Sequence, residues 1–194
     1  MHHSSVFRHE GHVTPDDRAT LLKQKPATIW LTGLSAAGKS TLAFALERKL
    51  IESGHSCYVL DGDNVRHGLN RDLGFSAEDR SENIRRIAEV AKLMNDAGLI
   101  VITAFISPFL ADRALARSVI GAEIFREVYV NTPLSVCEQR DPKKLYQKAR
   151  KGEVAEFTGI SSPYEPPVNP DLILDTSTLS QQDATDQLVS LLHL

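Results

Sequence analysis

The sequence predicts an α/β fold in which five parallel strands form one sheet with helices on both faces. Strand-sized apolar runs alternate with segments of helical periodicity along the chain. Residues 99–105 are apolar almost without interruption, which is typical of a central parallel strand covered on both faces. A glycine-containing loop at residues 33–40 joins the first strand to a helix. Together these features indicate a three-layer architecture.

Composition sets the broad class. At 194 residues and 21.4 kDa, we expect one domain at residues 26–194, preceded by a polar arm at residues 1–25. The net charge of −3 gives no general attraction for nucleic acid, and no apolar run is long enough to span a membrane. Cys57 and Cys137 form no C-x-x-C pair, so we expect buried, reduced thiols in a cytoplasmic protein.

The first elements follow from local signals. In the arm, Thr14 followed by Pro15 predicts a helix start, because threonine caps helices and proline fits the first turn. Residues 28–32 are β-branched and aromatic, which predicts the first strand. The helix after the glycine-containing loop is expected to end before Gly54, and residues 56–60 form the second expected strand.

A long helix is expected at about residues 77–97, and its apolar positions recur at i, i+3 and i+4. Arg80 and Asn83 continue this inward stripe at its N-terminal end. A buried arginine needs a counter-charge, so we interpret them as the wall of an anion pocket, although a structural salt bridge is the alternative. After the central strand, Ser107 and Pro108 predict the N-cap and first turn of a helix that runs to about residue 120.

The rest of the chain continues the alternation. Residues 125–130 form the fourth expected strand, and a short helix follows, ending near residue 139. The segment at about residues 140–160 is rich in lysine and arginine, and we interpret it as a mobile lid over phosphates. Residues 161–170 contain four prolines and form an extended connector. The last strand is expected at residues 172–174 and the last helix at residues 180–194.

The loop at residues 33–40 matches the phosphate-binding pattern G-x-x-x-x-G-K-[ST] at every fixed position. Because a strand precedes it and a helix follows, it predicts the P-loop NTPase fold. Backbone N–H groups and the helix N-terminus would cradle phosphates, Lys39 would reach the β- and γ-phosphates, and Ser40 would hold Mg²⁺. The expected ATP-binding residues are Gly33, Leu34, Ser35, Ala36, Ala37, Gly38, Lys39, Ser40 and Thr41.

Two carboxylates follow the second strand, at the sheet edge where parallel sheets bind ligands. We interpret Asp61 as a magnesium ligand and Asp63 as the group that accepts a proton from a hydroxyl. The alternative for both is an ordinary turn that caps a helix. Ser107 lies at the same edge, where it could contact phosphate.

These features favour a small-molecule kinase. A GTPase would carry N-K-x-D, which is absent. Another small-molecule P-loop kinase, of the nucleoside monophosphate or gluconate type, and a non-catalytic nucleotide-binding module remain as alternatives. A non-catalytic module would have no need for Asp63, Arg66 and Arg80 to converge.

Six stretches of the chain resemble the adenylyl-sulfate kinase family: DGDNVRHGL at 61–69, DLGFS at 72–76, ENIRR at 82–86, FISP at 105–108, RDPK at 140–143 and FTGI at 157–160. The resemblance implies that ATP phosphorylates the 3′-hydroxyl of adenosine 5′-phosphosulfate in sulfate assimilation, giving PAPS and ADP. It also implies a cytoplasmic homodimer.

The resemblance assigns roles residue by residue. It makes Asp63 the base or orienter at the acceptor hydroxyl and adds Ser107 to a catalytic set that already holds Lys39 and Asp61, and it implies that Arg140 stacks on the ATP adenine. Phe75 and Phe157 would sandwich the acceptor's adenine. We expect direct transfer rather than a phosphoserine at Ser107, which has no adjacent base in sequence. The implied acceptor-site residues are Asp63, Arg66, Phe75, Arg80, Asn83, Ile106, Ser107, Lys143 and Phe157.

Overall fold

The computed structural model describes residues 7, 9 and 11–193, so most of the first ten residues of the predicted arm lie outside the description. One five-stranded sheet has the order β2-β3-β1-β4-β5, and all four strand pairings are parallel. The predicted α/β fold class with five parallel strands is confirmed. The strands are β1 (Ala27–Thr32), β2 (Cys57–Asp61), β3 (Ile100–Ala104), β4 (Phe125–Val130) and β5 (Leu172–Leu174).

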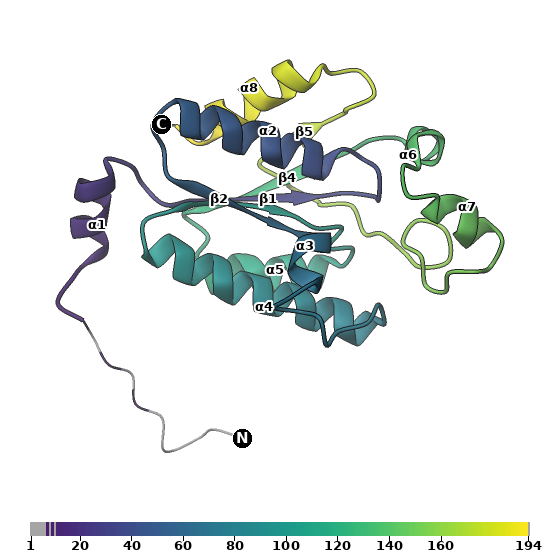
Figure 1. The fold of residues 1–194 in the computed structure, drawn as a ribbon, viewed down its shortest axis with the longest axis horizontal. Helices are drawn as coiled ribbons and strands as arrows, with labels where there is room; N and C mark the ends of the chain where they lie inside the picture. The colour runs from purple at the N-terminus through teal and green to yellow at the C-terminus, as the bar shows by residue number, and fades with distance from the viewer. Residues whose placement is uncertain (1–6, 8, 10, 194) are drawn as a thin grey trace.

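Helices cover both faces of the sheet (Figure 1). Helices α2 (Lys39–Glu52) and α8 (Gln181–Leu191) pack on one face, while α4 (Ala77–Asp96) and α5 (Leu110–Ile120) pack on the other. The shorter helices are α1 (Pro15–Leu22), α3 (Gly62–Arg66), α6 (Leu134–Arg140) and α7 (Leu145–Arg150). Within the described residues, no helix combines the length and apolar character that crossing a membrane requires.

Side chains alternate across β1 and therefore supply both layers of the core. Ile29 and Leu31 pack in the layer that includes α2 and α8. Trp30 points the other way, is fully buried, and stacks on Phe105 and Phe125 with ring centroids 6.2 and 5.6 Å away. The central strand thus fixes the sheet between its two helical layers.

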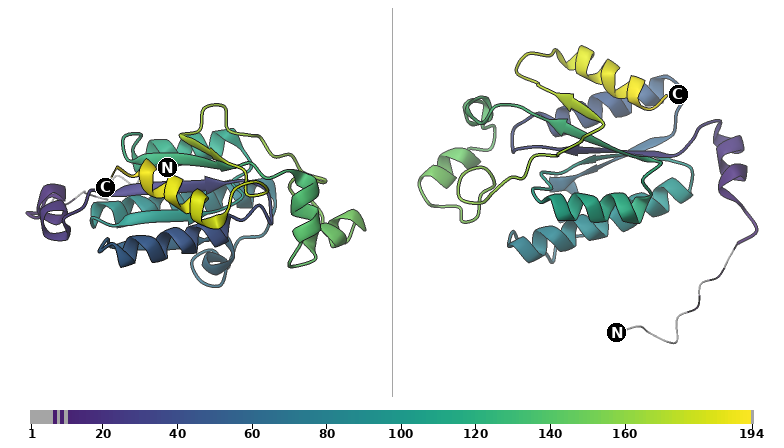
Figure 2. Two further views of the ribbon diagram at one scale, coloured as in Figure 1. Left: turned by 90° about the horizontal axis from the view of Figure 1, so that it is seen from above. Right: turned by 180° about the vertical axis from the view of Figure 1, so that it is seen from behind.

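Helix α1 lies at the opposite end of the sheet from α6 and α7 (Figures 1 and 2). Thr14 caps α1 as predicted, accepting a hydrogen bond from the N–H of Asp17. After the helix, the buried Gln24 side chain bonds the backbone of Ser56 and Gly98. These bonds attach the chain before β1 to that end of the sheet.

The predicted start of the helix after β3 is wrong. Helix α5 begins at Leu110, not at Pro108, and Ser107 is not its N-cap. Ser107 instead has a left-handed backbone with φ of +39°. The N–H of Leu110 donates to the carboxylate of Glu165, a residue 55 positions later in the sequence, at 2.6 Å. The residues before α5 are therefore released from the helix to form a loop at the ligand edge of the sheet.

Candidate active site

A cleft of about 1150 Å³ opens at the carboxyl ends of the strands. Its wall is formed by the phosphate loop, α3, the start of α4, the loop after β3 and the segment after α6. The cleft brings together most of the predicted site residues. Gly33, Leu34 and Ala37 belong to the phosphate loop but do not line the cleft. The predicted residues that line it are Ser35, Ala36, Gly38, Lys39, Ser40, Thr41, Asp61, Asp63, Arg66, Phe75, Arg80, Asn83, Ile106, Ser107, Arg140, Lys143 and Phe157.

The backbone of the phosphate loop requires its first glycine. A Cβ on Gly33 would lie 2.5 Å from the carbonyl oxygen of Val130. The Lys39 side chain turns back into the loop, where Nζ donates to the carbonyl oxygens of Gly33 and Leu34 at 2.8 and 2.6 Å. Burial lowers the pKa of this ammonium from 10.5 to about 8. The loop therefore holds a buried cation directly beside its phosphate cradle.

Ser40 and Asp61 meet at the floor of the cleft. The Ser40 hydroxyl donates to Oδ2 of Asp61 at 2.6 Å. The other carboxylate oxygen of Asp61 accepts from the backbone N–H groups of Asp63 and Asn64 and so caps α3. Both readings of Asp61 therefore apply, because it caps a helix and also presents one oxygen beside Ser40. A hydroxyl and a carboxylate are oxygen donors of the kind that Mg²⁺ prefers.

Asp63 stands in the first turn of α3, and its carboxylate is largely exposed to the cleft. Lys143, from the segment after α6, forms an ion pair with it. The ion pair joins a residue that follows β2 to one that lies 80 positions later. The sequence predicted that both residues belong to the site but not that they contact each other.

Two arginines form the opposite wall. Arg66 donates to the carbonyl oxygens of Leu73 and Gly74, and its guanidinium lies 4.4 Å from the ring centroid of Phe75. Arg80 donates to the carbonyl oxygen of Phe75 at 2.8 Å. It also bonds two residues of the predicted lid, the Thr158 hydroxyl and the Glu156 carbonyl. In this structure, then, backbone and hydroxyl oxygens satisfy the guanidinium of Arg80.

Asn83 is buried and has a partner that the sequence did not reveal. Its Oδ1 accepts from Nδ2 of Asn70 at 2.9 Å, and Asn70 is fully buried. This bond fixes the orientation of the Asn83 amide and leaves its NH₂ group as the donor for the cleft. The Oδ1 of Asn70 has no hydrogen-bond partner among the described residues. Asn70 sits in a polar loop, where no periodicity marks it as buried.

The lid segment is attached to the phosphate loop. Phe157 is buried, and its ring packs edge-on against Tyr146 of α7 with centroids 4.9 Å apart. The Tyr146 hydroxyl donates to the carbonyl oxygen of Ser35 at 3.0 Å. Phe75, the other predicted adenine contact, is by contrast largely exposed. Tyr146 is thus a second residue that sequence reasoning missed.

Arg140 lines the cleft beside Thr176, and Thr176 belongs to the loop after β5. Its guanidinium donates to the Thr176 hydroxyl and carbonyl oxygens at 2.8 and 2.7 Å. The hydroxyls of Thr176 and Thr132 both donate to the carbonyl oxygen of Ala37. Both threonines therefore brace the phosphate loop, although no motif marks them.

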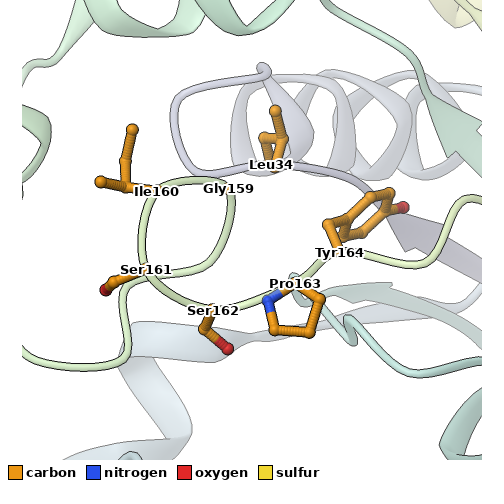
Figure 3. A pocket seen from close by; sticks show the side chains of 7 residues that line it. All are labelled: Leu34, Gly159, Ile160, Ser161, Ser162, Pro163 and Tyr164. Atoms are coloured by element: carbon orange, nitrogen blue, oxygen red, sulfur yellow. The ribbon is translucent and has the colours of Figure 1, made fainter.

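A smaller open pocket of about 530 Å³ borders the phosphate loop at Leu34 (Figure 3). In Figure 3 the side chains of Leu34, Pro163 and Tyr164 lie around the turn formed by residues 159–162. A Cβ on Gly159 would lie 3.0 Å from Leu34. The chain leaving the lid therefore passes close against the phosphate loop.

Comparisons with known proteins agree on one family. Residues 25–175 match the family described as Adenylylsulphate kinase. The adenylyl-sulfate kinase of Vibrio vulnificus is 59% identical over 190 residues, which are 98% of this chain and 92% of that protein. A probable adenylyl-sulfate kinase of Halalkalibacterium halodurans is 58% identical over 188 residues, 97% of this chain and 93% of that protein.

Solved structures agree with the sequence comparisons. The Mycobacterium tuberculosis APS kinase CysC, determined in complex with AMPPNP and APS, is 52% identical with a TM-score of 0.84. That similarity covers 88% of this chain and 99% of that chain. A gluconokinase from Sinorhizobium meliloti, at 15% identity and a TM-score of 0.55, shares the fold alone. The chain therefore belongs to the adenylylsulphate kinase family and is an ATP-dependent phosphotransferase.

Proposed function

We propose that the cleft transfers the γ-phosphate of ATP directly to the 3′-hydroxyl of adenosine 5′-phosphosulfate. One observation carries the proposal: a single cavity joins the phosphate loop at one end to Asp63, Arg66 and Arg80 at the other. Two anionic nucleotides can meet there head-on. The hydroxyl oxygen would form the new P–O bond while the bond to the β-phosphate oxygen breaks and ADP leaves.

The ATP side follows from the phosphate loop. Its backbone N–H groups and the N-terminus of α2 offer positive partial charge to the phosphates. The ammonium of Lys39, now bonded to two carbonyl oxygens of its own loop, would turn to the β- and γ-phosphates when they arrive. Arg140 lines the same cleft and would contact the adenine.

Ser40 and Asp61 fit a magnesium ion that arrives with ATP. Their oxygens lie 2.6 Å apart, and the remaining ligands would be phosphate oxygens and water, as is usual for this ion. When bound, the ion neutralises charge on the β- and γ-phosphates. Asp61 would keep its cap on α3 through the oxygen that faces away from Ser40.

Asp63 would accept the proton of the attacking hydroxyl or orient that hydroxyl. Its carboxylate is exposed to the cleft, and the backbone of α3 holds its position. Ser107 is an unsuitable nucleophile, because its hydroxyl accepts a hydrogen bond from the Trp30 indole at 3.2 Å and has no basic partner among the described residues. The geometry therefore supports direct transfer without a phosphoserine.

The acceptor side is formed by Arg66, Arg80 and Asn83, whose donors suit the phosphosulfate and the ribose. Phe157 packs edge-on against Tyr146, while the largely exposed Phe75 would meet an adenine ring with the face that Arg66 does not cover. Ile106, Ser107 and Lys143 would complete the contacts. Backbone oxygens and Thr158 now occupy Arg80, so acceptor binding would exchange these bonds for bonds to the ligand.

The decisive experiment is an ATP-dependent assay with adenosine 5′-phosphosulfate, run against gluconate and nucleoside monophosphates as rival acceptors. We expect turnover with adenosine 5′-phosphosulfate alone. Asp63→Asn should lower kcat by roughly 10²–10⁴-fold, the usual effect of losing a general base, while ATP binding stays near that of the wild type. Asp72→Asn is the matched control, since it removes another exposed, ion-paired carboxylate outside the cleft. A normal kcat for Asp63→Asn would remove Asp63 from the chemistry.

We also infer a homodimer, which rests on the family resemblance. Light scattering should then report twice the 21.4 kDa of one chain. A mass of one chain across the working concentration range would contradict the inference.

A further inference from the structure

Arg113 is a buried arginine that lies behind the site and does not line the cleft. It is on the first turns of α5 and is only 2% exposed. Its guanidinium donates three hydrogen bonds of 2.7 Å each. Nε bonds the Glu127 carboxylate, Nη1 bonds the carbonyl oxygen of Ser107, and Nη2 bonds the carbonyl oxygen of Glu165. One planar group therefore joins β4, the ligand-edge loop and the chain that returns from the lid.

The loop that Arg113 contacts needs support. Ser107 has a φ of +39°, a conformation that non-glycine residues adopt only when their surroundings enforce it. The Thr32 hydroxyl donates to the carbonyl oxygen of Ile106 at 2.7 Å, and the Trp30 indole donates to Oγ of Ser107. Arg113 supplies the shortest bond to Ser107 itself. Buried donors thus hold the inner face of the loop from behind.

The same guanidinium reaches the lid's return path. Glu165 lies in the connector that leaves the lid, and its N–H donates to the carbonyl oxygen of Pro108 at 2.8 Å. Tyr164 shares a 2.9 Å hydrogen bond with Thr32, and its ring lies 5.9 Å from the Arg113 guanidinium. The connector and the ligand-edge loop are therefore fixed to each other through Arg113.

An ion pair alone does not account for this geometry. A lysine could neutralise Glu127, but a single ammonium cannot present three donors in the plane that these acceptors require. Only one of the three acceptors, the Glu127 carboxylate, is charged. The other two are backbone oxygens of Ser107 and Glu165, which are far from β4 in the sequence. The surrounding acceptors therefore require the planar guanidinium, whose three nitrogens each donate to a different residue.

We propose that Arg113 is a positioning residue for the acceptor nucleotide, fixing the Ile106–Ser107 backbone in its acceptor-binding conformation. It acts through this loop and does not touch the reacting atoms. The inference rests on the assignment of Ile106 and Ser107 to the acceptor site under the proposed function. It adds a residue that holds the loop and ties it to the segment behind the lid.

The test compares Arg113→Lys with Arg117→Lys in the full chain. Arg113→Lys keeps a charge for Glu127 but leaves the Ser107 and Glu165 oxygens without their donors. Arg117 lies one turn later on α5 and pairs with Asp171 at 2.9 Å without contacting the loop, which makes it a matched control. We expect Arg113→Lys to raise KM for adenosine 5′-phosphosulfate about tenfold, with less than about a twofold change in KM for ATP. Arg117→Lys should change neither.

A second variant covers the case in which Arg113→Lys does not fold. The double substitution Arg113→Gln with Glu127→Gln removes both buried charges and leaves no unpaired one. We expect the same selective rise in KM for the acceptor. If the variants that fold all keep the acceptor KM within about twofold of the wild type, Arg113 has no positioning role.

The fluorescence of Trp30 gives a second measurement of acceptor binding. If Arg113 only stabilised the fold, its substitution would leave the ligand titration of this fluorescence unchanged. Trp30 is the single tryptophan of the chain and it bonds Ser107. Adenosine 5′-phosphosulfate should change Trp30 emission in the wild type and in Arg117→Lys, and Arg113→Lys should require about tenfold more ligand for the same change. If the ligand is phosphorylated but leaves wild-type emission unchanged, the assignment of the loop to the acceptor site fails. If emission responds and the Arg113 variant titrates like the wild type, the role of Arg113 fails.

Discussion

The chemistry of the site begins with Lys39, whose ammonium is charged although it is buried. Water is largely excluded from it, and two carbonyl oxygens of its own loop replace that hydration. The lowered pKa of about 8 reflects the remaining cost of burial. Phosphates would supply the counter-charge that the ligand-free loop lacks, so ATP binding should raise this pKa again.

A pH dependence of ATP binding follows. Above pH 8 the free enzyme loses the Lys39 proton, and ATP must then bind together with a proton. We expect the apparent affinity for ATP to fall about fivefold between pH 8 and pH 9, measured as the Kd of a fluorescent ATP analogue. In Lys39→Arg the guanidinium stays protonated throughout this range, so the pH dependence should disappear even if affinity is lower. An equally steep loss in Lys39→Arg would assign the dependence to another group.

Stability should move in the opposite direction with pH. The folded protein releases the Lys39 proton near pH 8, whereas the unfolded chain keeps it to about pH 10.5. Between these values the unfolded state binds more protons, so the contribution of Lys39 to the free energy of unfolding rises with pH. Lys39 therefore contributes more to the stability of the ligand-free protein in the same pH range in which it contributes less to ATP binding.

Residues with a motif could be predicted from the sequence, while residues that act through tertiary contacts could not. The glycine pattern marks the phosphate loop, and Asp61 and Asp63 follow a strand of the expected type. Thr176, Tyr146 and Asn70 contact the site from loops or short helices, at positions without periodicity or spacing. Their contacts form only when segments far apart in sequence meet. Arg113 was likewise invisible, because it lies on an ordinary amphipathic helix.

At the scale of elements, β1 and β3 were the best predicted, because burial on both faces leaves a mostly apolar run. Helix α4 also followed its apolar stripe, and Ile84, Ile87, Ala88 and Ala91 are all buried in the core. Helix α3 was not predicted, since five residues are too few to show a helical period. Helix α7 was hidden in the basic segment, where charge suggested only a lid.

The predicted start of α5 was wrong because tertiary contacts outweigh the local sequence signal. A serine followed by a proline is the usual signature of an N-cap and first turn. Here tertiary bonds from Arg113 and Thr32 hold the backbone of residues 106 and 107 in the ligand-edge loop, and the helix begins two residues later than the pattern predicts. Tertiary hydrogen bonds to residues 106 and 107 thus outweigh the local preference of Ser107 and Pro108 for a helix start.

Over the whole molecule, the sheet order places the ends of β1, β2 and β3 side by side. The phosphate loop, the Asp61–Asp63 turn and the Ser107 loop follow these three strands, so the topology itself assembles the site at one edge. The lid is the remaining wall. Its described ties to the opposite wall include the ion pair between Lys143 and Asp63 and the hydrogen bonds from Arg80 to Glu156 and Thr158.

Arg80 holds the lid segment in the ligand-free structure, and we propose that it binds the acceptor once the acceptor arrives. Arg80→Ala should raise KM for adenosine 5′-phosphosulfate about tenfold while changing KM for ATP much less. It should also speed amide hydrogen exchange of residues 151–160 in the ligand-free protein, because that segment loses its bonds to α4. Arg85→Ala is the matched control, as it removes an arginine of the same helix whose ion-pair partners among the described residues are Glu82 and Glu89.

The two readouts separate the two functions of Arg80. Faster exchange with an unchanged acceptor KM would limit Arg80 to holding the lid, and a raised acceptor KM with unchanged exchange would limit it to binding. Adding AMPPNP with adenosine 5′-phosphosulfate should slow exchange of residues 151–160 in the wild type and in Arg85→Ala, but much less in Arg80→Ala. This follows because the acceptor can draw the lid closed only through contacts on both walls of the cleft, and Arg80 is where those walls meet. An equal loss of ATP and acceptor binding would instead place Arg80 outside the acceptor site.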